Sequence, residues 1–324
     1  MKFFAVLTQL AIAALLAVLA GSAIAQPAFP TKSIRIISPY PPGGTTDQMA
    51  RFIGPKLTES WGQQVIVENR AGGNTVIGSE AMVKSAPDGY TLLSILVSHV
   101  IVPNLVATPY DPVKDFAAVA TIARTEPVLV VHPSVPANNL RELIALAKSR
   151  PGELNMGSAG VGSFQHLGGE LFTSMAGVNI VTVQYKGGGP AMMDAVAGNV
   201  QLMFSSLVQT LSQIRGGKLK ALGVGGLKRS STLPEVPTIS EAGVPGYEAV
   251  NWWGIIAPVG TPRPILARLH KEITAIQQSP EMQKRFQAEA VEAMPMEPAE
   301  FGRYIEAEIV KWAAVIKRAG IRAE

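Results

Sequence analysis

Four turns rich in glycine or serine are the places in this chain where chemistry is expected. They lie at residues 38–47, 157–163, 185–190 and 205–206, each between a β-like run and a helical run. A helix that begins at such a turn has unpaired N–H groups and the positive end of its dipole there, so it can bind an anion without an arginine. The turns therefore predict a receptor for a small acid.

The sequence lacks the motifs of the common catalytic sites. A hydrolase elbow needs Gly-x-Ser-x-Gly, whereas Met156 stands two residues before Ser158. The dinucleotide fingerprint fails at its third glycine after Gly160 and Gly162, and the sequence has no Gly-Lys-Ser/Thr phosphate loop. The four histidines lack paired ligand spacing and there is no cysteine. We expect no catalytic residue, metal or cofactor, with an exported α/β enzyme as the alternative class.

The first 25 residues have the pattern of a cleaved signal peptide. Lys2 precedes an apolar run over 3–20, and Ala23-Ile24-Ala25 has the small-x-small ending of a signal-peptidase site. These features predict a signal peptide over 1–25 and a periplasmic mature chain. An uncleaved membrane anchor is the alternative, because the run is about long enough to span a bilayer.

The charge of the chain argues against a nucleic-acid partner. The formal net charge is +4, from 28 lysines and arginines and 24 acids. The basic residues are scattered among the acids and form no run or stripe of the kind that nucleic-acid grooves require.

Hydrophobic periodicity alternates strands with helices along most of the chain. Strands are expected at 33–37, 65–68, 90–95, 128–131, 154–157, 180–185, 200–204, 219–224 and 252–257. Helices are expected at 46–61, 163–176, 190–197, 208–215, 262–278, 281–290 and 298–317, and another follows a cap at Asn138 or Asn139. Thr261 is expected to cap the helix at 262–278, with Pro262 at its first position. Strands separated by helices are typical of an α/β fold with mostly parallel sheets.

Seven motifs follow one another along the chain in a characteristic order. They are Tyr-Pro-Pro-Gly-Gly-x-x-Asp-x-x-Ala-Arg at 40–51, Val-Glu-Asn-Arg-Ala-Gly-Gly-Asn at 67–74, Ala-Pro-Asp-Gly-Tyr-Thr-Leu at 86–92, Gly-Ser-Ala-Gly-x-Gly-Ser-x-x-His-Leu-x-Gly-Glu at 157–170, Tyr-Lys-Gly-x-x-Pro-Ala at 185–191, Pro-Glu-Val-Pro-Thr-Ile-Ser-Glu-Ala-Gly at 234–243 and Ala-Pro-x-Gly-Thr-Pro at 257–262. Their order resembles that of the substrate-binding proteins of tripartite tricarboxylate transporters, the Bug or TctC-type family. Gln201, Ser205-Ser206 and Val102 depart from the family pattern, and the last two departures lie near the expected cleft.

This resemblance implies a two-lobed type II periplasmic-binding-protein fold that closes on its ligand. Lobe one is expected at 26–126 plus 251–324 and lobe two at 127–250, with crossover strands at 126–131 and 250–257. Trp252 and Trp253 fall in the second crossover, whereas Trp61 and Trp312 are expected on helices of lobe one, away from the hinge movement.

The resemblance also implies an extracytoplasmic receptor, expected to be a monomer. It would capture a small organic acid and deliver it to the membrane subunits of a tripartite tricarboxylate-type transporter. The ligand stays open between a di- or tricarboxylate, an aromatic acid and an amino acid. A receptor that feeds a membrane sensor kinase is the alternative.

The candidate ligand-binding residues lie at the ends of strands, where the turns of both lobes converge. They are Pro42, Gly43, Gly44, Thr45, Thr46, Asp47, Ser98, His99, Ser158, Ala159, Gly160, Ser163, His166, Tyr185, Lys186, Gly187, Ser205 and Ser206. Asp47 either favours the helix start, orients the loop or meets a ligand ammonium or hydroxyl. His166 is a packing or capping partner or a ligand contact, and Lys186 is a cation at the cleft or a solvated lysine.

The Ala23-Ile24-Ala25 ending gives the first testable prediction. We expect the mature protein to begin at Gln26 and to be recovered from the soluble periplasmic fraction of a Gram-negative host. Mass spectrometry of the purified N-terminal peptide checks this, and an intact Met1 in the membrane fraction would show that the segment is an anchor.

Overall fold

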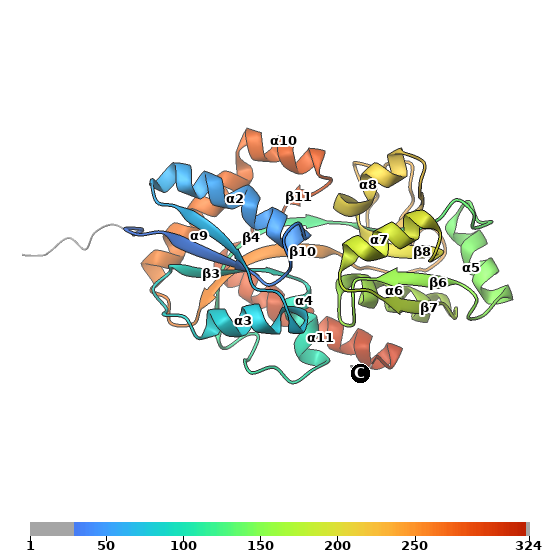
Figure 1. The fold of residues 1–324 in the computed structure, drawn as a ribbon, viewed down its shortest axis with the longest axis horizontal. Coiled ribbons are helices and arrows are strands. Elements are labelled where there is room, and N and C mark those ends of the chain that lie inside the picture. Colours follow the sequence, from blue (N-terminus) through green and yellow to red (C-terminus); the bar gives the residue numbers. More distant parts are fainter. Residues whose placement is uncertain (1–28, 322–324) are drawn as a thin grey trace, which may run out of the picture.

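The computed structural model describes residues 29–321, which form two α/β lobes (Figure 1). Lobe one is built on β1 (Ile34–Ser38), β2 (Val65–Asn69), β3 (Thr91–Leu96), β4 (Phe116–Thr125), β10 (Asn251–Pro258) and β11 (Glu292–Ala293). Lobe two is built on β5 (Pro127–Val131), β6 (Asn155–Ser158), β7 (Val181–Gln184), β8 (Leu202–Ser206) and β9 (Lys220–Val224). The strand orders are β11-β4-β10-β3-β1-β2 and β7-β6-β8-β5-β9.

Helices pack against both sheets and between them (Figure 1). In lobe one they are α2 (Thr45–Trp61), the 3-10 turn η1 (Gly73–Thr75), α3 (Val76–Val83), α4 (Ser98–Ile101), the 3-10 turn η2 (Val102–Asn104), α9 (Arg263–Gln278), α10 (Pro280–Ala288) and α11 (Pro298–Ala319). In lobe two they are α5 (Leu140–Ser149), α6 (Phe164–Ala176), α7 (Gly188–Ala197) and α8 (Leu207–Arg215).

The sheets are parallel where a helix joins neighbouring strands and antiparallel at the passages between the lobes. β1 runs parallel to β2 and β3, and β6 runs parallel to β7 and β8. β10 is antiparallel to β3 and β4, and β5 is antiparallel to β8 and β9. A parallel pair needs a crossover connection, usually a helix. β5 enters lobe two after a short turn at Glu126, and β10 returns to lobe one after the loop at 225–250. The predicted α/β fold is confirmed, but each sheet is mixed where mostly parallel sheets were expected.

The structure differs from the sequence prediction at one helix cap and at one strand. Thr261 does not cap α9, because its hydroxyl donates to the carbonyl of Pro258 and Pro262 takes the cap position. The ten-residue strand β4 was not predicted, although it pairs with β10 along most of its length.

The structure also decides between the two residues expected to cap the helix after 138. Asn139 is the N-cap of α5, and its side chain accepts from the amide of Glu142 at 3.0 Å.

A buried carboxylate ties β10 to α11. Glu308 is 5% exposed and accepts hydrogen bonds from the indole nitrogens of Trp252 at 3.2 Å and Trp312 at 3.1 Å. Lys311 donates to its other oxygen at 3.1 Å. Trp312 lies on α11 as expected, but its ring also packs edge-on against Phe164 of α6, with centroids 6.1 Å apart. Its surroundings therefore include lobe two, which the sequence did not indicate.

The predicted signal peptide lies outside the described residues. Within residues 29–321, none of the helices combines the length with the apolar composition that crossing a bilayer demands.

Replacing Glu308 tests how much this buried contact stabilises the fold. Glu308→Leu leaves two buried indole N–H groups without an acceptor, so we expect the free energy of unfolding to fall by about 2–4 kcal/mol. Glu308→Gln keeps one accepting oxygen and should cost clearly less. Urea titration of the three proteins measures the difference, and equal stability of all three would show that these hydrogen bonds contribute nothing net.

Candidate ligand-binding cleft

The N-termini of four helices from both lobes meet at one small cavity. Gly44, Ser163, Gly187 and Ser206 are the N-cap residues of α2, α6, α7 and α8, and all four line a cavity of about 70 Å³ between the lobes. Since the first amides of a helix have no partner within the helix, each of these ends presents N–H donors and a partial positive charge. The cavity is therefore prepared for an anion.

Several polar side chains on the cavity wall are buried without a hydrogen-bond partner in the described part of the chain. They are the hydroxyls of Thr46, Ser98 and Ser206 and the amide oxygen of Asn251. Buried polar groups in proteins are nearly always hydrogen-bonded, and an unpaired one costs about 1–3 kcal/mol. A polar ligand or water in the cavity would satisfy them.

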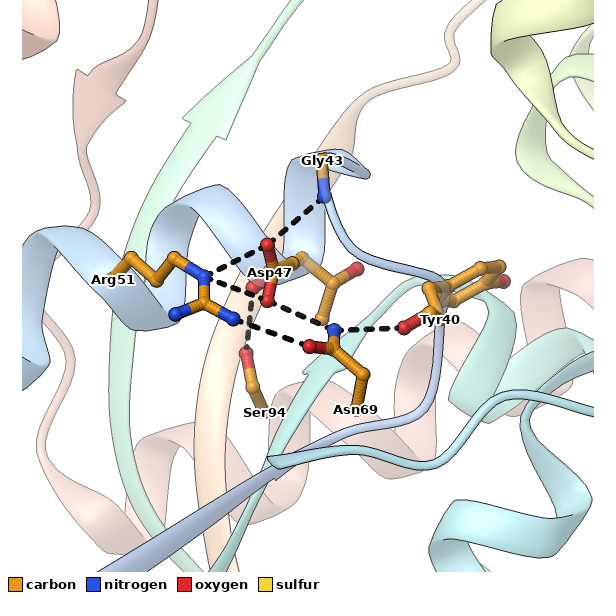
Figure 2. A network of polar contacts seen from close by, with 7 residues as sticks. Tyr40, Gly43, Asp47, Arg51, Asn69 and Ser94 are labelled. Atoms are coloured by element: carbon orange, nitrogen blue, oxygen red, sulfur yellow. Dashed lines mark hydrogen bonds and ion pairs between the residues drawn. The ribbon is translucent and has the colours of Figure 1, made fainter. Parts of the chain in front are cut away.

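Asp47 holds the first turn in shape (Figure 2). Its carboxylate accepts from the amide of Gly43 at 3.0 Å, from Nε of Arg51 at 3.0 Å and from Nδ2 of Asn69 at 2.8 Å. The same Asn69 nitrogen donates to the carbonyl of Tyr40 at 3.0 Å, so one buried acid links both ends of the turn. Of the three roles considered for Asp47, the structure supports the orientation of the loop.

These contacts also set the protonation of Asp47. Burial alone would raise its pKa, but the hydrogen bonds from Arg51, Gly43 and Asn69 outweigh burial and hold the pKa below its ordinary value. The acid is therefore ionised wherever the protein is folded near neutral pH.

The turn before α6 is held by its own side chains. The hydroxyl of Ser163 accepts from the amide of His166 at 3.2 Å and lies 3.3 Å from the hydroxyl of Ser158. Nδ1 of His166 accepts from the amide of Gly162 at 3.2 Å, which makes His166 a capping partner within the turn. Burial lowers the pKa of His166, although Glu170 acts in the opposite direction.

Three further candidates lie away from the cavity wall. His99 is buried with Nε2 3.0 Å from the carbonyl of Pro112, and burial lowers its pKa to about 4. The hydroxyl of Tyr185 donates to Asp194 at 2.6 Å. Lys186 is exposed to solvent.

The cavity thus includes part of the predicted set and several residues that the sequence did not single out. The predicted residues on its wall are Gly44, Thr45, Thr46, Ser98, Ala159, Ser163, Gly187 and Ser206. The predicted residues outside it are Pro42, Gly43, Asp47, His99, Ser158, Gly160, His166, Tyr185, Lys186 and Ser205. The wall also contains Tyr40, Leu96, Phe164, Gln165, Gly188, Gln209 and Asn251. Tyr40 stood in a quoted motif and Gly188 in the predicted turn at 185–190, whereas nothing in the sequence marked Gln209 or Asn251.

Two glutamines form the polar wall of lobe two. Oε1 of Gln209 accepts from the hydroxyl of Ser205 at 2.9 Å and from Nε2 of Gln165 at 3.4 Å. A side chain at Gly188 would place its Cβ 2.9 Å from Nε2 of Gln209. Because glycine has no side chain, position 188 leaves room for Gln165 and Gln209 beside the start of α7.

A larger cavity of about 520 Å³ lies beside the β4–β5 passage. Its wall includes Glu126, the Arg124–Glu292 ion pair and residues 230–232. Burial, reinforced by the charge of Glu292, raises the pKa of Glu126 to about 7. Its charged wall contains no N-cap residue of the four converging helices. The smaller cavity at the helix ends is therefore the better candidate for an anion. Over the described range, no three His, Asp or Glu side chains gather as a metal site would require.

Comparison with known proteins shows which family of sequences and structures the chain is similar to. Residues 49–321 match the family described as "Tripartite tricarboxylate transporter family receptor". The chain is 37% identical to Protein BugT of Bordetella pertussis over 300 residues, 91% of each chain. It is similar to the structure of R. palustris Rpa4515 with adipate, with a TM-score of 0.86 and 36% identity over 91% of this chain and 99% of that one. It is also similar to the periplasmic binding protein BugD, with a TM-score of 0.84 and 31% identity over 91% of this chain and 100% of that one.

The low pKa of Asp47 gives a prediction with a defined pH window. Asp47→Asn should lower the free energy of unfolding by about 1–3 kcal/mol at neutral pH, because hydrogen bonds to a charged group are lost. Since the folded pKa lies below the ordinary value of 3.8, this stabilisation is complete above about pH 4–5 and is lost as the pH falls through the folded pKa.

Urea unfolding of both proteins at several pH values measures the difference. Glu59→Gln, which alters an exposed carboxylate on the same helix, is the control and should change stability by less than about 1 kcal/mol. A difference between Asp47→Asn and the unaltered protein that stays constant down to pH 3 would contradict the assignment.

Proposed function

The chain belongs to the receptor family of tripartite tricarboxylate transporters, and we propose that it captures a small carboxylate between its lobes and presents it to the membrane subunits of such a transporter. The convergence of the N-termini of α2, α6, α7 and α8 on one cavity carries this proposal. The wall of that cavity contains no lysine, arginine, aspartate or glutamate among the described residues.

Neutral donors are sufficient to hold a carboxylate in such a place. Each helix end contributes about 0.3–1 kcal/mol to a nearby anion at the surface and up to about 2 kcal/mol when partly buried. The hydroxyls of Thr46, Ser98 and Ser206 add donors that have no other partner in the described protein. Because lobe one supplies α2 and lobe two supplies the other three helices, a bound ligand contacts both lobes and favours their closure.

The arrangement of the polar groups supports binding without turnover. The hydroxyl of Ser163 contacts the backbone amide of His166, whereas the His166 ring accepts from Gly162. Within the described range, no imidazole accepts from the Ser163 hydroxyl, as activation of a serine nucleophile requires. The functional state of the receptor in this proposal is a periplasmic monomer, with lobe one at 26–126 plus 251–324 and lobe two at 127–250.

A dicarboxylate of about four to six carbons is the ligand class that we propose. Donors at opposite walls suit a molecule with an acceptor at each end, and the glutamine pair Gln165 and Gln209 stands on the wall of lobe two. The related Rpa4515 structure contains adipate, a molecule of this class.

A thermal-shift screen of organic acids, adipate and succinate included, tests the proposed function. A ligand that binds only the folded state at a hundredfold excess over its Kd stabilises it by about 2.7 kcal/mol. Calorimetry then gives the stoichiometry, and product analysis checks that the acid is recovered unchanged. Turnover of the acid would refute a pure receptor, and the absence of binding to any carboxylate would refute the ligand class.

The unpaired hydroxyls give a prediction that separates binding from stability. Ser206→Ala and Thr46→Val should each weaken binding of the acid found in the screen by about tenfold or more, because a hydrogen bond to a charged group is lost. Neither should destabilise the ligand-free protein, since neither hydroxyl has a hydrogen-bond partner among residues 29–321. Lys186→Ala should cost less affinity than either. Calorimetry that ranks Lys186 as the dominant loss would reverse this assignment.

A further inference from the structure

Asn74 makes a hydrogen bond from one lobe to the other. Its Nδ2 donates to the carbonyl of Val161 at 2.6 Å, and its Oδ1 accepts from the hydroxyl of Tyr40 at 3.4 Å. Among residues 29–321, this is the one side-chain hydrogen bond that joins lobe one to lobe two. Val161 lies in the turn before α6, and Tyr40 lies on the wall of the ligand cavity.

The backbone around Asn74 is held in a costly conformation. Asn74 has φ 48° and Thr75 has φ 88°, both in the left-handed region that a β-branched residue such as Thr75 rarely adopts. Asparagine tolerates this region, whereas a β-branched residue such as Thr75 costs about 1–3 kcal/mol there and persists where the surroundings fix it, often at ligand clamps and switches. Thr75 is 3% exposed, so the strained residue is firmly packed.

The opposite side of the contact has no room for a side chain. A Cβ on Gly162 would lie 2.7 Å from Cδ1 of Leu105 and 2.9 Å from Nδ2 of Asn74, both in lobe one. Gly162 also has φ 74°, which favours glycine. The two lobes therefore meet here in close contact, and the fit depends on the shape of both turns.

We infer that Asn74 is an interlobe clasp, a positioning residue that sets the affinity of the cleft by stabilising its closed form without touching the ligand. The inference rests on the proposed function, because it assigns a regulatory role at the same cleft. Asn74 is absent from the wall of the ligand cavity and lines a separate apolar groove with Val102, Leu105 and Val161. Apparent affinity scales with the fraction of molecules in the binding-competent form, so a contact that favours closure raises affinity from outside the site.

The clasp is also connected to the ligand. Tyr40 forms part of the cavity wall and donates to Asn74, which in turn donates to Val161. A ligand that packs against the Tyr40 ring therefore favours the tyrosine orientation that supports the clasp. Closure and binding reinforce each other through this chain of two hydrogen bonds.

Two variants disturb the clasp in different ways. Asn74→Asp keeps the shape and the oxygen that faces Tyr40 but removes the donor to Val161. Gly162→Ala keeps every donor, inserts a methyl group between the lobes and also strains its own turn, where φ is 74°. Asn179→Asp introduces the same charge in the exposed turn between α6 and β7 and is the matched control.

The absence of cysteine from the chain allows a clean distance measurement. Spin labels on cysteines introduced at the exposed positions Gln64 in lobe one and Lys148 in lobe two report the separation of the lobes by pulsed electron paramagnetic resonance. In ligand-free protein we expect both clasp variants to lose short distances and gain long ones, while the Asn179→Asp control matches the unaltered chain. Circular dichroism confirms that every variant is folded. Distance distributions that are identical in all four folded proteins would overturn the clasp.

Stopped-flow measurements with the first carboxylate that shifts the melting temperature, starting from adipate, provide the second test. Loss of one hydrogen bond should raise the dissociation rate by about three- to tenfold and leave the association rate nearly unchanged. Unchanged dissociation from Asn74→Asp would also overturn the clasp. If no carboxylate binds the unaltered protein, the proposed function fails, whereas the label distances still test the clasp.

Discussion

The N-terminal ends of four helices, all with partial positive charge, meet at one cavity in this fold, and the rest of the structure must hold them there. The N-termini of α2, α6, α7 and α8 carry unpaired amides and partial positive charge into a single small cavity. Without an anion these ends repel one another, so the lobes must be held together by other contacts. The sheets supply the framework, since turns that follow strands reach the cleft between them. The acid Asp47 contributes a negative charge just behind the first turn and fixes its shape.

Apolar and polar contacts away from the cleft hold the lobes in place. β10 lies at the centre of the larger sheet and begins where the chain returns from lobe two. Glu308 joins Trp252 of this strand to Trp312 of α11, and Trp312 packs on Phe164 of α6. One buried carboxylate therefore connects the returning strand, the C-terminal helix and the lobe opposite. Through Trp312 and Phe164 the carboxylate is thereby linked to α6, whose N-cap residue Ser163 lies on the wall of the cavity.

Local chemistry explains which parts of the site could be predicted from the sequence. Gly44, Ser163, Gly187 and Ser206 stand at helix starts, and the residue types that start helices are visible without a structure. Gln209 and Asn251 reach the cavity only because the two lobes bring distant segments of the chain together, and no local pattern in the sequence shows this.

Other predictions failed because a side chain makes a different local contact. His99 was predicted from its place after a strand, but its side chain turns to Pro112. The strand β4 lacked a strict alternation because β10 and neighbouring helices cover much of it. Thr261 is of a type favoured at helix caps, but its hydroxyl donates to the carbonyl of Pro258 in the preceding turn.

The neutral wall of the cleft has a consequence for the surroundings in which this chain can work. Ion pairs formed with a ligand at the surface weaken as salt rises, because the Debye length shortens to about 8 Å at physiological ionic strength and about 3 Å at 1 M. Amide and hydroxyl donors buried between two lobes are screened far less. An acid held by helix ends and hydroxyls in this cleft is therefore expected to lose less affinity at high salt than one held by surface ion pairs.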